Sequence, residues 1–370
     1  MQQLNERQRF LIVNLVSPYT GQNEAEVELE ELTSLVETYG GATVVRVIQR
    51  RMHPDSHTFI GGGKTEEIAE MITKDRINAV VLNAIVKPGQ LFELEKIFRV
   101  SNPNIKVWDR VDLILHIFSK HATTQEAKLQ IELARMRHMG PRIFGMGMEM
   151  SRQGGGIGTR GIGETNTELM KRHWRNETKV ITDKLEKISA DRQRQLDRRR
   201  EIGFKTISIV GYTNAGKSTL FNKLSGKKNI AENILFATLD STVGKIFLPT
   251  LKKEVILSDT IGFIQNLPAK LITAFKSTLM EAINADLLLH VIDASDHMLN
   301  EKIQTVEEAL AELKINDKKK IYVFNKVDKA TILDKKGLSE TYAEFTPQFV
   351  SVKTGEGMPQ LMNMIEHLME

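Results

Sequence analysis

The sequence predicts an α/β protein in which two strand–helix regions flank a helical hairpin. Short apolar runs alternate with amphipathic segments in residues 1–120 and again in residues 201–370, as in sheets whose strands are joined by crossover helices. Between these regions, capping boxes that begin at Thr123 and Thr165 open long helical patterns around a glycine-rich segment. These observations divide the chain into three expected domains, residues 1–120, 121–200 and 201–370.

The composition indicates a globular protein with more than one domain. The chain has 370 residues, of which 41% are hydrophobic and 26% are charged, and this length exceeds what one compact core accommodates. No apolar run approaches the ~20 residues that cross a bilayer, so we expect no membrane span. Cysteine is absent, which excludes disulfides and thiolate metal sites and is typical of a reducing cytosol. We therefore expect a cytoplasmic protein. Nothing in the sequence demands an oligomer, so we expect a monomer.

Residues 1–120 are predicted to form a small α/β subdomain with a mainly parallel sheet. Strands are expected at residues 10–16, 42–48, 79–82 and 105–108, and helices at 24–39, 65–73 and 90–99. The run Gly61-Gly62-Gly63-Lys64-Thr65 resembles a phosphate-binding loop, but its first glycine is missing because position 58 is Thr. We favour a tight turn that opens a helix, and nucleotide binding at this turn stays open as the alternative.

Residues 121–200 are predicted to form a long antiparallel helical hairpin. The first helix runs from Thr123 to about Met139, and the second runs from Thr165 to about Arg200, a length of roughly 50 Å. Antiparallel pairing would place residues 140–164 at the tip as a loop. This loop would contain nine of the 25 glycines and cannot build a core of its own. Its arginines are Arg142, Arg152 and Arg160.

The positive charge of the chain is concentrated in the hairpin. Residues 121–200 hold 17 Lys and Arg against 10 Asp and Glu, while the whole chain has a net charge of only +4. A local basic excess favours a polyanionic partner such as RNA. A solvated helix face explains the same charge, and composition alone does not separate the two interpretations.

Residues 201–370 are predicted to form a second α/β domain. Strands are expected at residues 206–210, 255–257, 287–292, 321–324 and 349–352, and helices at 268–283, 301–313 and 359–370.

A phosphate-binding loop of the pattern G-x-x-x-x-G-K-[ST] follows the first strand of this domain. Glycines in such a loop allow consecutive backbone N–H groups to converge on phosphate oxygens at a helix N-terminus. Lys217 is expected to bridge the β- and γ-phosphates, and the Ser218 hydroxyl is expected to ligate Mg²⁺. The loop consists of Gly211, Tyr212, Thr213, Asn214, Ala215, Gly216, Lys217 and Ser218.

Two further segments are expected to sense the terminal phosphate. Asp259 follows the strand at 255–257, where its carboxylate can reach the Mg²⁺ shell through water, and the Gly262 N–H can contact a γ-phosphate. In the second segment Thr238 is the preferred second Mg²⁺-binding hydroxyl, and Thr242 is its competitor. The expected catalytic residues are therefore Lys217, Thr238 and Gly262. The two segments comprise Asp259, Thr260, Ile261 and Gly262, and Phe236, Ala237, Thr238, Leu239 and Asp240.

A guanine-reading motif completes the predicted site. The Asp328 carboxylate can accept two N–H bonds from guanine, and adenine lacks that pair of donors. A loop after the strand at 349–352 would back the base. The motif and this loop comprise Asn325, Lys326, Val327 and Asp328, and Ser351, Val352 and Lys353. The three motifs, in this order, predict a GTPase that binds GTP.

Hydrolysis by the protein alone is expected to be slow. Phe263 stands where many GTPases have a glutamine that orients the attacking water, and a phenylalanine cannot make that hydrogen bond. A partner or a monovalent cation would then supply the missing interaction. Asn214 resembles the asparagine that K⁺-assisted GTPases use as an ion ligand, and an asparagine that caps a turn explains it equally well.

Beyond the nucleotide motifs, the chain resembles the HflX family of translational GTPases from about residue 10 to its end. The matching segments are residues 211–218, Leu235-Phe236-Ala237-Thr238-Leu239-Asp240 and Asp259-Thr260-Ile261-Gly262-Phe263-Ile264. Outside the GTPase domain they are Glu126-Ala127-Lys128-Leu129-Gln130 and Ser151-Arg152-Gln153-Gly154-Gly155-Gly156-Ile157-Gly158-Thr159-Arg160-Gly161.

This resemblance implies a Ras-like P-loop GTPase domain preceded by an N-terminal HflX domain. It also implies association with the large (50S) ribosomal subunit and its rRNA, stimulation of the GTPase by ribosomes, and dissociation of stalled or idle 70S ribosomes under stress. The protein would then be cytoplasmic and partly ribosome-associated. By this carry-over Ser218 and Thr238 are the Mg²⁺ ligands, and the arginines of the predicted tip contact RNA.

Two alternatives use the same nucleotide site. One is a ribosome-assembly or RNA-modification GTPase, and the other is a GTP-gated RNA-binding module in which hydrolysis only resets binding.

Overall fold

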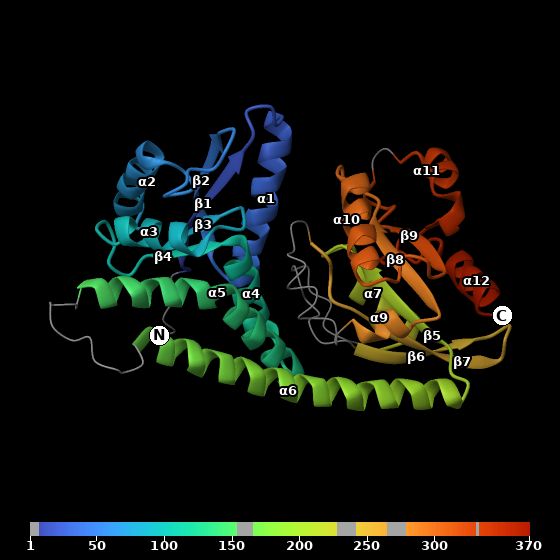
Figure 1. The fold of residues 1–370 in the computed structure, drawn as a ribbon. Coiled ribbons are helices and arrows are strands. Elements are labelled where there is room, and N and C mark those ends of the chain that lie inside the picture. The colour runs from blue at the N-terminus through green and yellow to red at the C-terminus, as the bar shows by residue number, and fades with distance from the viewer. Residues whose placement is uncertain (1–6, 154–165, 228–241, 265–278, 331–332) are drawn as a thin grey trace, which may run out of the picture. The chain divides into compact units, whose positions relative to one another are not determined.

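The computed structural model describes residues 7–153, 166–227, 242–264, 279–330 and 333–370 (Figure 1). The chain divides into two compact units. The N-terminal unit comprises Met1–Lys120 and Ile131–Lys184, and the C-terminal unit comprises His121–Gln130 and Leu185–Glu370. Helices α5 (Gln125–Gln153) and α6 (Asn166–Glu201) both continue across this division, so each unit contains part of the hairpin.

The N-terminal unit has a four-stranded parallel sheet, as predicted. Its order is β2-β1-β3-β4, with β1 (Arg9–Val16), β2 (Ala42–Arg50), β3 (Ala79–Leu82) and β4 (Lys106–Asp109). The order reverses beside β1, and right-handed crossovers then place helices on both faces. Accordingly, α1 (Gln22–Tyr39) lies on one face, and α2 (Gly62–Lys74) and α3 (Pro88–Phe98) lie on the other (Figure 1).

Helix α4 (Arg110–His121) follows β4 and is an element that the sequence analysis did not predict. Two carboxylates cap its first turn reciprocally. The Asp112 N–H donates to Asp109 Oδ1 at 2.8 Å, and the Asp109 N–H donates to Asp112 Oδ2 at 3.3 Å. His138 of α5 lies beside them, with Nε2 at 3.1 Å from Asp109 Oδ1. This contact ties the α5 part of the N-terminal unit to its sheet.

The predicted tip loop at residues 140–164 is wrong over its first part, because α5 remains helical to Gln153. Gly140 has a packing role within this helix. A Cβ atom there would lie 2.9 Å from Nε1 of Trp174 on α6, and that nitrogen donates to the Met136 carbonyl at 3.2 Å. Arg142 and Arg152 therefore lie on α5, and Arg160 lies outside the described residues.

The C-terminal unit has a six-stranded sheet of order β10-β9-β8-β5-β7-β6. Strand β6 pairs antiparallel with β7 at one edge, and the other pairings are parallel. The strands are β5 (Thr206–Gly211), β6 (Thr242–Leu248), β7 (Lys253–Asp259), β8 (Leu287–Asp293), β9 (Lys320–Asn325) and β10 (Gln348–Phe349). Strand β6 is a second element that was not predicted.

Helices cover both faces of this sheet. Leu220 and Phe221 of α7 (Lys217–Ser225) share one core with Leu361 and Ile365 of α12 (Met358–Met369), and α10 (Leu299–Glu312) packs on the other face. Of the helix expected at 268–283, the described part is α9 (Met280–Asn284). Within the described part of this unit, the remaining helical segments are α11 (Lys335–Thr341) and the 3₁₀ turn η1 (Ala343–Phe345). Among the described residues, no helix combines the length and apolar character that a bilayer span requires.

Candidate nucleotide site

The predicted nucleotide residues meet at the carboxyl ends of the central strands of the C-terminal sheet. Strand β5 is flanked by β7 on one side and β8 on the other, so the strand order reverses at β5. In open α/β sheets, ligands bind outside the carboxyl ends at such a reversal. The loop at residues 211–218 leaves β5 at this point and leads directly into α7.

The phosphate-binding loop has positive φ angles at three positions, Gly211, Asn214 and Gly216. Gly216, which precedes α7, has φ 98° and lies against the Asn325 side-chain amide, so a side chain at this position would be strained and would also collide with that amide. Asn214 is exposed and has φ 60°, a conformation that asparagine tolerates better than most residues.

Lys217 and Ser218 begin α7 and point toward the loop and β7. The buried Lys217 ammonium donates to the Tyr212 carbonyl at 2.7 Å, and the Ser218 hydroxyl donates to Asp259 Oδ2 at 2.6 Å. Burial lowers the pKa of Lys217 to about 8, Asp259 opposes this shift, and Lys326 adds to it. An anionic phosphate beside the ammonium would favour its charged form. The Lys217 ammonium, the Ser218 hydroxyl and the Asp259 carboxylate therefore gather at the start of α7.

The segment after Asp259 runs alongside the phosphate-binding loop. The Phe263 N–H donates to the Gly211 carbonyl at 3.1 Å, and the Thr213 N–H donates to the Phe263 carbonyl at 2.8 Å. A Cβ atom at Gly262 would lie 2.9 Å from the Thr213 Cα, so a side chain there would displace the backbone of the phosphate-binding loop. The Phe263 side chain is buried and has no hydrogen-bonding group to orient water.

Asn325 joins the phosphate-binding loop to the predicted base-backing loop. Its side-chain amide donates to the Ala215 carbonyl at 2.9 Å, and its side-chain carbonyl accepts the Val352 N–H at 3.2 Å. Asp328 is exposed, and the buried Ser351 hydroxyl donates to its Oδ1 at 2.6 Å. This hydrogen bond lowers the pKa of Asp328 and keeps its carboxylate in the accepting form that a guanine N–H pair requires.

Asp293 at the end of β8 was not among the predicted site residues. The Lys326 ammonium donates to Asp293 Oδ2 at 2.6 Å and to the Asn214 carbonyl at 2.8 Å, and Lys326 itself has φ 64°. Asp293 therefore positions the lysine that connects the guanine motif with the phosphate-binding loop. The available signal was a carboxylate directly after the apolar run 287–292, on the strand next to β9.

The structure thus brings together residues from four predicted segments, namely 211–218, 259–262, 325–328 and 351–353. Phe236, Ala237, Thr238, Leu239 and Asp240 lie outside the described residues. Thr242, the competitor of Thr238 as the second Mg²⁺-binding hydroxyl, begins β6 and pairs with Asp259 in the strand register.

The fold and this set of residues define a P-loop GTPase. The GTPase HflX of Caldanaerobacter subterraneus is 40% identical over 361 residues, which cover 98% of this chain and 80% of that protein. The GTPase HflX of Escherichia coli is 37% identical over 351 residues, which cover 95% of this chain and 81% of that protein. The chain therefore belongs to the HflX family of GTPases, and it hydrolyses GTP.

Three family models match consecutive parts of the chain. They are described as GTP-binding GTPase N-terminal (residues 26–119), GTP-binding GTPase Middle Region (residues 121–199) and 50S ribosome-binding GTPase (residues 206–326). The first two confirm the expected N-terminal HflX region, and the third confirms the GTPase domain.

Solved structures support the fold. A GTP-binding protein from the archaeon Sulfolobus solfataricus, in complex with GDP, is 24% identical with a TM-score of 0.51, and the match covers 98% of each chain. A second structure, described as an SsGBP and GDP complex, matches with a TM-score of 0.54 at the same identity and coverage. At this level of identity, the likeness concerns the fold alone.

Proposed function

We propose that this GTPase uses GTP to control its association with the large (50S) ribosomal subunit, and that this association dissociates stalled or idle 70S ribosomes under stress. The observation that carries the proposal is the direct connection between a basic helix and the nucleotide site. Helix α6 ends at Glu201 and β5 begins at Thr206, so four residues separate the hairpin from the strand that leads into the phosphate-binding loop. The 50S ribosome-binding description of the matching family model supports the choice of partner.

Nucleotide recognition in this proposal follows the contacts of the site. Lys217 and the loop N–H groups bind the phosphates, and the Gly262 N–H contacts the γ-phosphate. Asn325, Lys326 and Asp328 read the guanine base, and residues 351–353 back it. Asp328 discriminates against adenine, because a base without two N–H donors would leave the carboxylate oxygens without hydrogen-bond partners.

The residues also fit a Mg²⁺ ion. The Ser218 hydroxyl and an Asp259 carboxylate oxygen lie 2.6 Å apart beside the loop, and Mg²⁺ prefers hard oxygen ligands. Ser218 and Thr238 are the proposed direct ligands, and Asp259 acts through water. A bound ion would supply positive charge to the phosphate oxygens during hydrolysis.

RNA contacts are assigned to the hairpin. Arg142 and Arg152 lie on α5, in the segment that carries the net positive charge, and Arg160 completes the proposed set. Arginine contacts to phosphate oxygens position a protein on a folded RNA surface. The proposed locations of the protein are the cytoplasm and the ribosome, with the monomer as the active form.

Light scattering of purified 70S ribosomes tests the proposal. Addition of the protein with a non-hydrolysable GTP analogue should lower the scattering, because the subunits separate. Binding to ribosomes without loss of the 70S signal would instead support a GTP-gated RNA-binding module or an assembly factor.

A triple variant locates the RNA contact within the same assay. Arg142→Ala, Arg152→Ala and Arg160→Ala together should abolish splitting and leave GTP affinity unchanged. The matched control removes three exposed positive charges from the C-terminal unit, at Lys253, Lys319 and Lys336. Full splitting activity in the arginine variant would refute the assignment of the contact.

A further inference from the structure

We infer that the Thr213 hydroxyl is a catalytic group for GTP hydrolysis, and that it donates a hydrogen bond to an oxygen of the γ-phosphoryl group during the reaction. Thr213 is the third residue of the phosphate-binding loop, and only 6% of its surface is exposed. Its hydroxyl has no hydrogen-bond partner among the described residues. The inference rests on the part of the proposed function that places the γ-phosphate beside Lys217 and Gly262, and it does not involve the ribosome.

The other aliphatic hydroxyls of the four described nucleotide segments have partners within the protein. Ser218 and Ser351 donate to the two carboxylates described above. The completely buried Thr260 hydroxyl donates to the Ile209 carbonyl at 2.7 Å. A buried hydroxyl that lost its bonds to water and gained none in return costs free energy. Thr213 is therefore the hydroxyl of this set that is suited to a bond with the substrate.

The contacts of Thr213 place its side chain beside the groups that are proposed to bind the terminal phosphate. A Cβ atom built at Gly262 would lie 2.7 Å from the Thr213 Cγ2 and 2.9 Å from the Lys217 Nζ. The same ammonium donates to the carbonyl of Tyr212, which belongs to the peptide bond that joins Tyr212 to Thr213. Since Oγ1 and Cγ2 of a threonine are attached to one carbon atom, the hydroxyl is also close to the Gly262 backbone.

The Thr213 side chain is held in place before any nucleotide binds. The Thr213 N–H donates to the Phe263 carbonyl at 2.8 Å, and the Phe263 N–H donates to the Gly211 carbonyl at 3.1 Å, so the backbone on both sides is fixed. A β-branched side chain has few accessible rotamers, and the Thr213 methyl group packs against Gly262. The hydroxyl is therefore preorganised, as a group that stabilises a transition state must be.

Hydrolysis builds negative charge beside this hydroxyl. The oxygen of a water molecule forms a bond to the γ-phosphorus, and the bond from the γ-phosphorus to the β–γ bridging oxygen breaks, so its electron pair leaves with GDP. The proton that the water loses passes to the released phosphate. Thr213 keeps its own proton throughout, and its hydrogen bond stabilises the charge that is spread over the γ-phosphoryl oxygens.

Three substitutions of Thr213 separate the hydroxyl from the size of the side chain. Thr213→Val keeps the shape and removes the hydroxyl, Thr213→Ser keeps the hydroxyl and removes the methyl group, and Thr213→Ala removes both. Thr43→Val is the matched control, because the Thr43 hydroxyl, on β2 of the N-terminal unit, likewise has no partner in the described part of the chain.

The measured quantity is the rate constant of GTP hydrolysis in a single turnover, with the protein in excess and without ribosomes. Thr213→Val and Thr213→Ala should each lower it about 10²-fold, as the removal of one preorganised donor does. Thr213→Ser should stay within about threefold of the parent, and Thr43→Val should not differ from it. The affinity for a fluorescent GDP, which has no γ-phosphate, should stay within about twofold in every variant.

The GDP measurement shows whether each variant is folded. Should Thr213→Val lose GDP binding, Thr213→Ala and Thr213→Ser decide between the hydroxyl and the size of the side chain. Parental rates in the variants without a hydroxyl overturn the inference, and so does a Thr213→Ser variant that is as slow as Thr213→Ala.

Lys217→Ala distinguishes a failure of this inference from a failure of the proposed phosphate site. Parental affinity for a non-hydrolysable GTP analogue in Lys217→Ala would show that the phosphates do not lie beside Lys217, and the role of Thr213 would fall with that placement. Loss of analogue binding in Lys217→Ala, together with parental hydrolysis in Thr213→Val and Thr213→Ala, would keep the phosphate site and reject the role of Thr213 alone.

Discussion

The turn that opens α2 and the turn that opens α7 have the same residue types, but their side chains have different partners. Both turns present a left-handed glycine just before a helix, at Gly61 with φ 83° and at Gly216 with φ 98°, and both continue with a lysine and a hydroxyl residue. At the α7 turn, the lysine is buried beside Asp259 and the hydroxyl bonds that carboxylate.

At the α2 turn, the lysine and the hydroxyl residue instead bond groups of their own turn and helix. Lys64 pairs with Glu67 one turn later, and the Thr65 hydroxyl donates to the Gly61 carbonyl at 2.8 Å. The Arg51 guanidinium lies over the glycine and donates to the Ile60 carbonyl at 3.2 Å. At the α7 turn, Ser218 bonds Asp259 and Gly216 lies against Asn325, and both partners stand at the ends of strands of the same sheet. We therefore expect a phosphate site to depend on such neighbours rather than on the glycine run itself.

The largest effect is expected at the guanine-reading motif, residues 325–328, which lies beside the α7 turn. Asp328→Asn should lower GTP affinity about 10⁴-fold and favour xanthosine triphosphate. The carboxylate accepts hydrogen bonds from guanine, whereas the asparagine side chain would present an N–H donor at one of these positions. Competition binding with both nucleotides measures this. Asp317→Asn, at an exposed position, is the control. Equal binding of both nucleotides with wild-type affinity would show that Asp328 does not read the base.

A matched pair of lysine variants tests the comparison directly. Lys217→Ala should weaken GTP binding about 10²- to 10³-fold, because it removes a buried charge from the phosphates. Lys64→Ala should leave GTP affinity unchanged, since its ammonium pairs with Glu67 on the surface. Isothermal titration with GTP and with ATP compares the two variants. A similar loss of binding in Lys64→Ala would mean that the α2 turn holds a nucleotide.

Asn214, which has a positive φ inside the phosphate-binding loop, is a further difference between the two turns. Asn214 has a side chain that can ligate a cation, whereas Gly61 has none. If Asn214 holds K⁺, turnover should be severalfold faster in KCl than in NaCl, and Asn214→Ala should abolish the difference. Steady-state phosphate release in the two salts decides this. The absence of any cation dependence in the wild type would show that Asn214 does not hold K⁺.

A smaller effect follows from the burial of Lys217. Burial lowers its pKa to about 8 in the nucleotide-free protein, and only its protonated form attracts phosphate. GTP affinity should therefore be constant below pH 7 and fall as the pH rises through 8, by about fourfold at pH 8.5 relative to pH 7. Fluorescence titration across this range measures it. The profile of Lys217→Ala should be flat, and a matching decline in that variant would assign the titration to another group.

The smallest effect belongs to the α2 turn. Gly61→Ala should destabilise the N-terminal unit by about 1 kcal/mol, because φ 83° disfavours a side chain and the added carbon meets Arg51. Thermal unfolding measures the change, and Gly62→Ala is the control, since a Cβ atom there meets nothing within 4 Å. GTP affinity should be unchanged in both. An equal loss of stability in the two variants would show that the turn conformation is not the cause.

The sequence predicted the parallel strands well, because buried central strands are continuous apolar runs. It missed α4, in which Val111, Ile114 and Phe118 are buried together with most of their neighbours, so no amphipathic stripe marks the helix. It ended α5 too early, because glycine disfavours helix interiors. The packing of Trp174 against Gly140 could not be foreseen from propensity.

The site was predictable where contiguous motifs carry the chemistry, as in residues 211–218 and 325–328. Asp293 was not foreseen, because its role depends on the pairing of β8 with β9 and on the left-handed turn at Lys326. The two backbone bonds of Phe263 with the phosphate-binding loop were likewise not foreseen, since no side-chain pattern encodes them.

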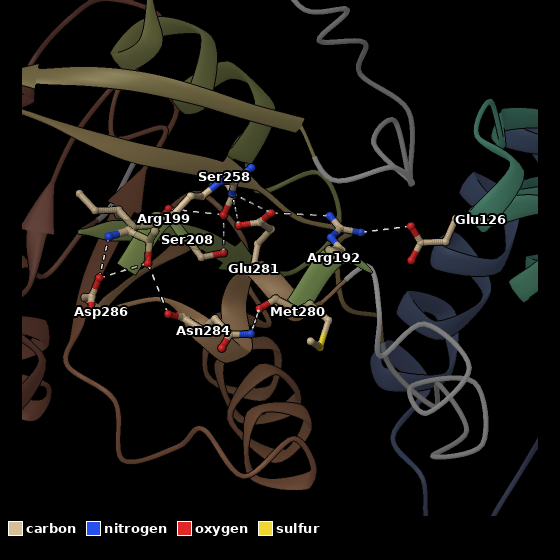
Figure 2. A network of polar contacts seen from close by, with 11 residues as sticks. Glu126, Arg192, Arg199, Ser208, Ser258, Met280, Glu281, Asn284 and Asp286 are labelled. Atoms are coloured by element: carbon tan, nitrogen blue, oxygen red, sulfur yellow. Dashed lines mark hydrogen bonds and ion pairs between the residues drawn. The ribbon is translucent and has the colours of Figure 1, made fainter. Parts of the chain in front are cut away.

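Glu281 of α9 is buried, and both Arg192 and Arg199 of α6 form ion pairs with its carboxylate (Figure 2). This arrangement limits how the gene can be divided. A recombinant fragment that begins after Glu201 matches the expected domain boundary, but it lacks both guanidinium groups that neutralise this carboxylate. Such a fragment would leave the Glu281 carboxylate without these partners, so we expect α9 to loosen as water reaches it. Kinetic constants measured on such a fragment would then differ from those of the full chain.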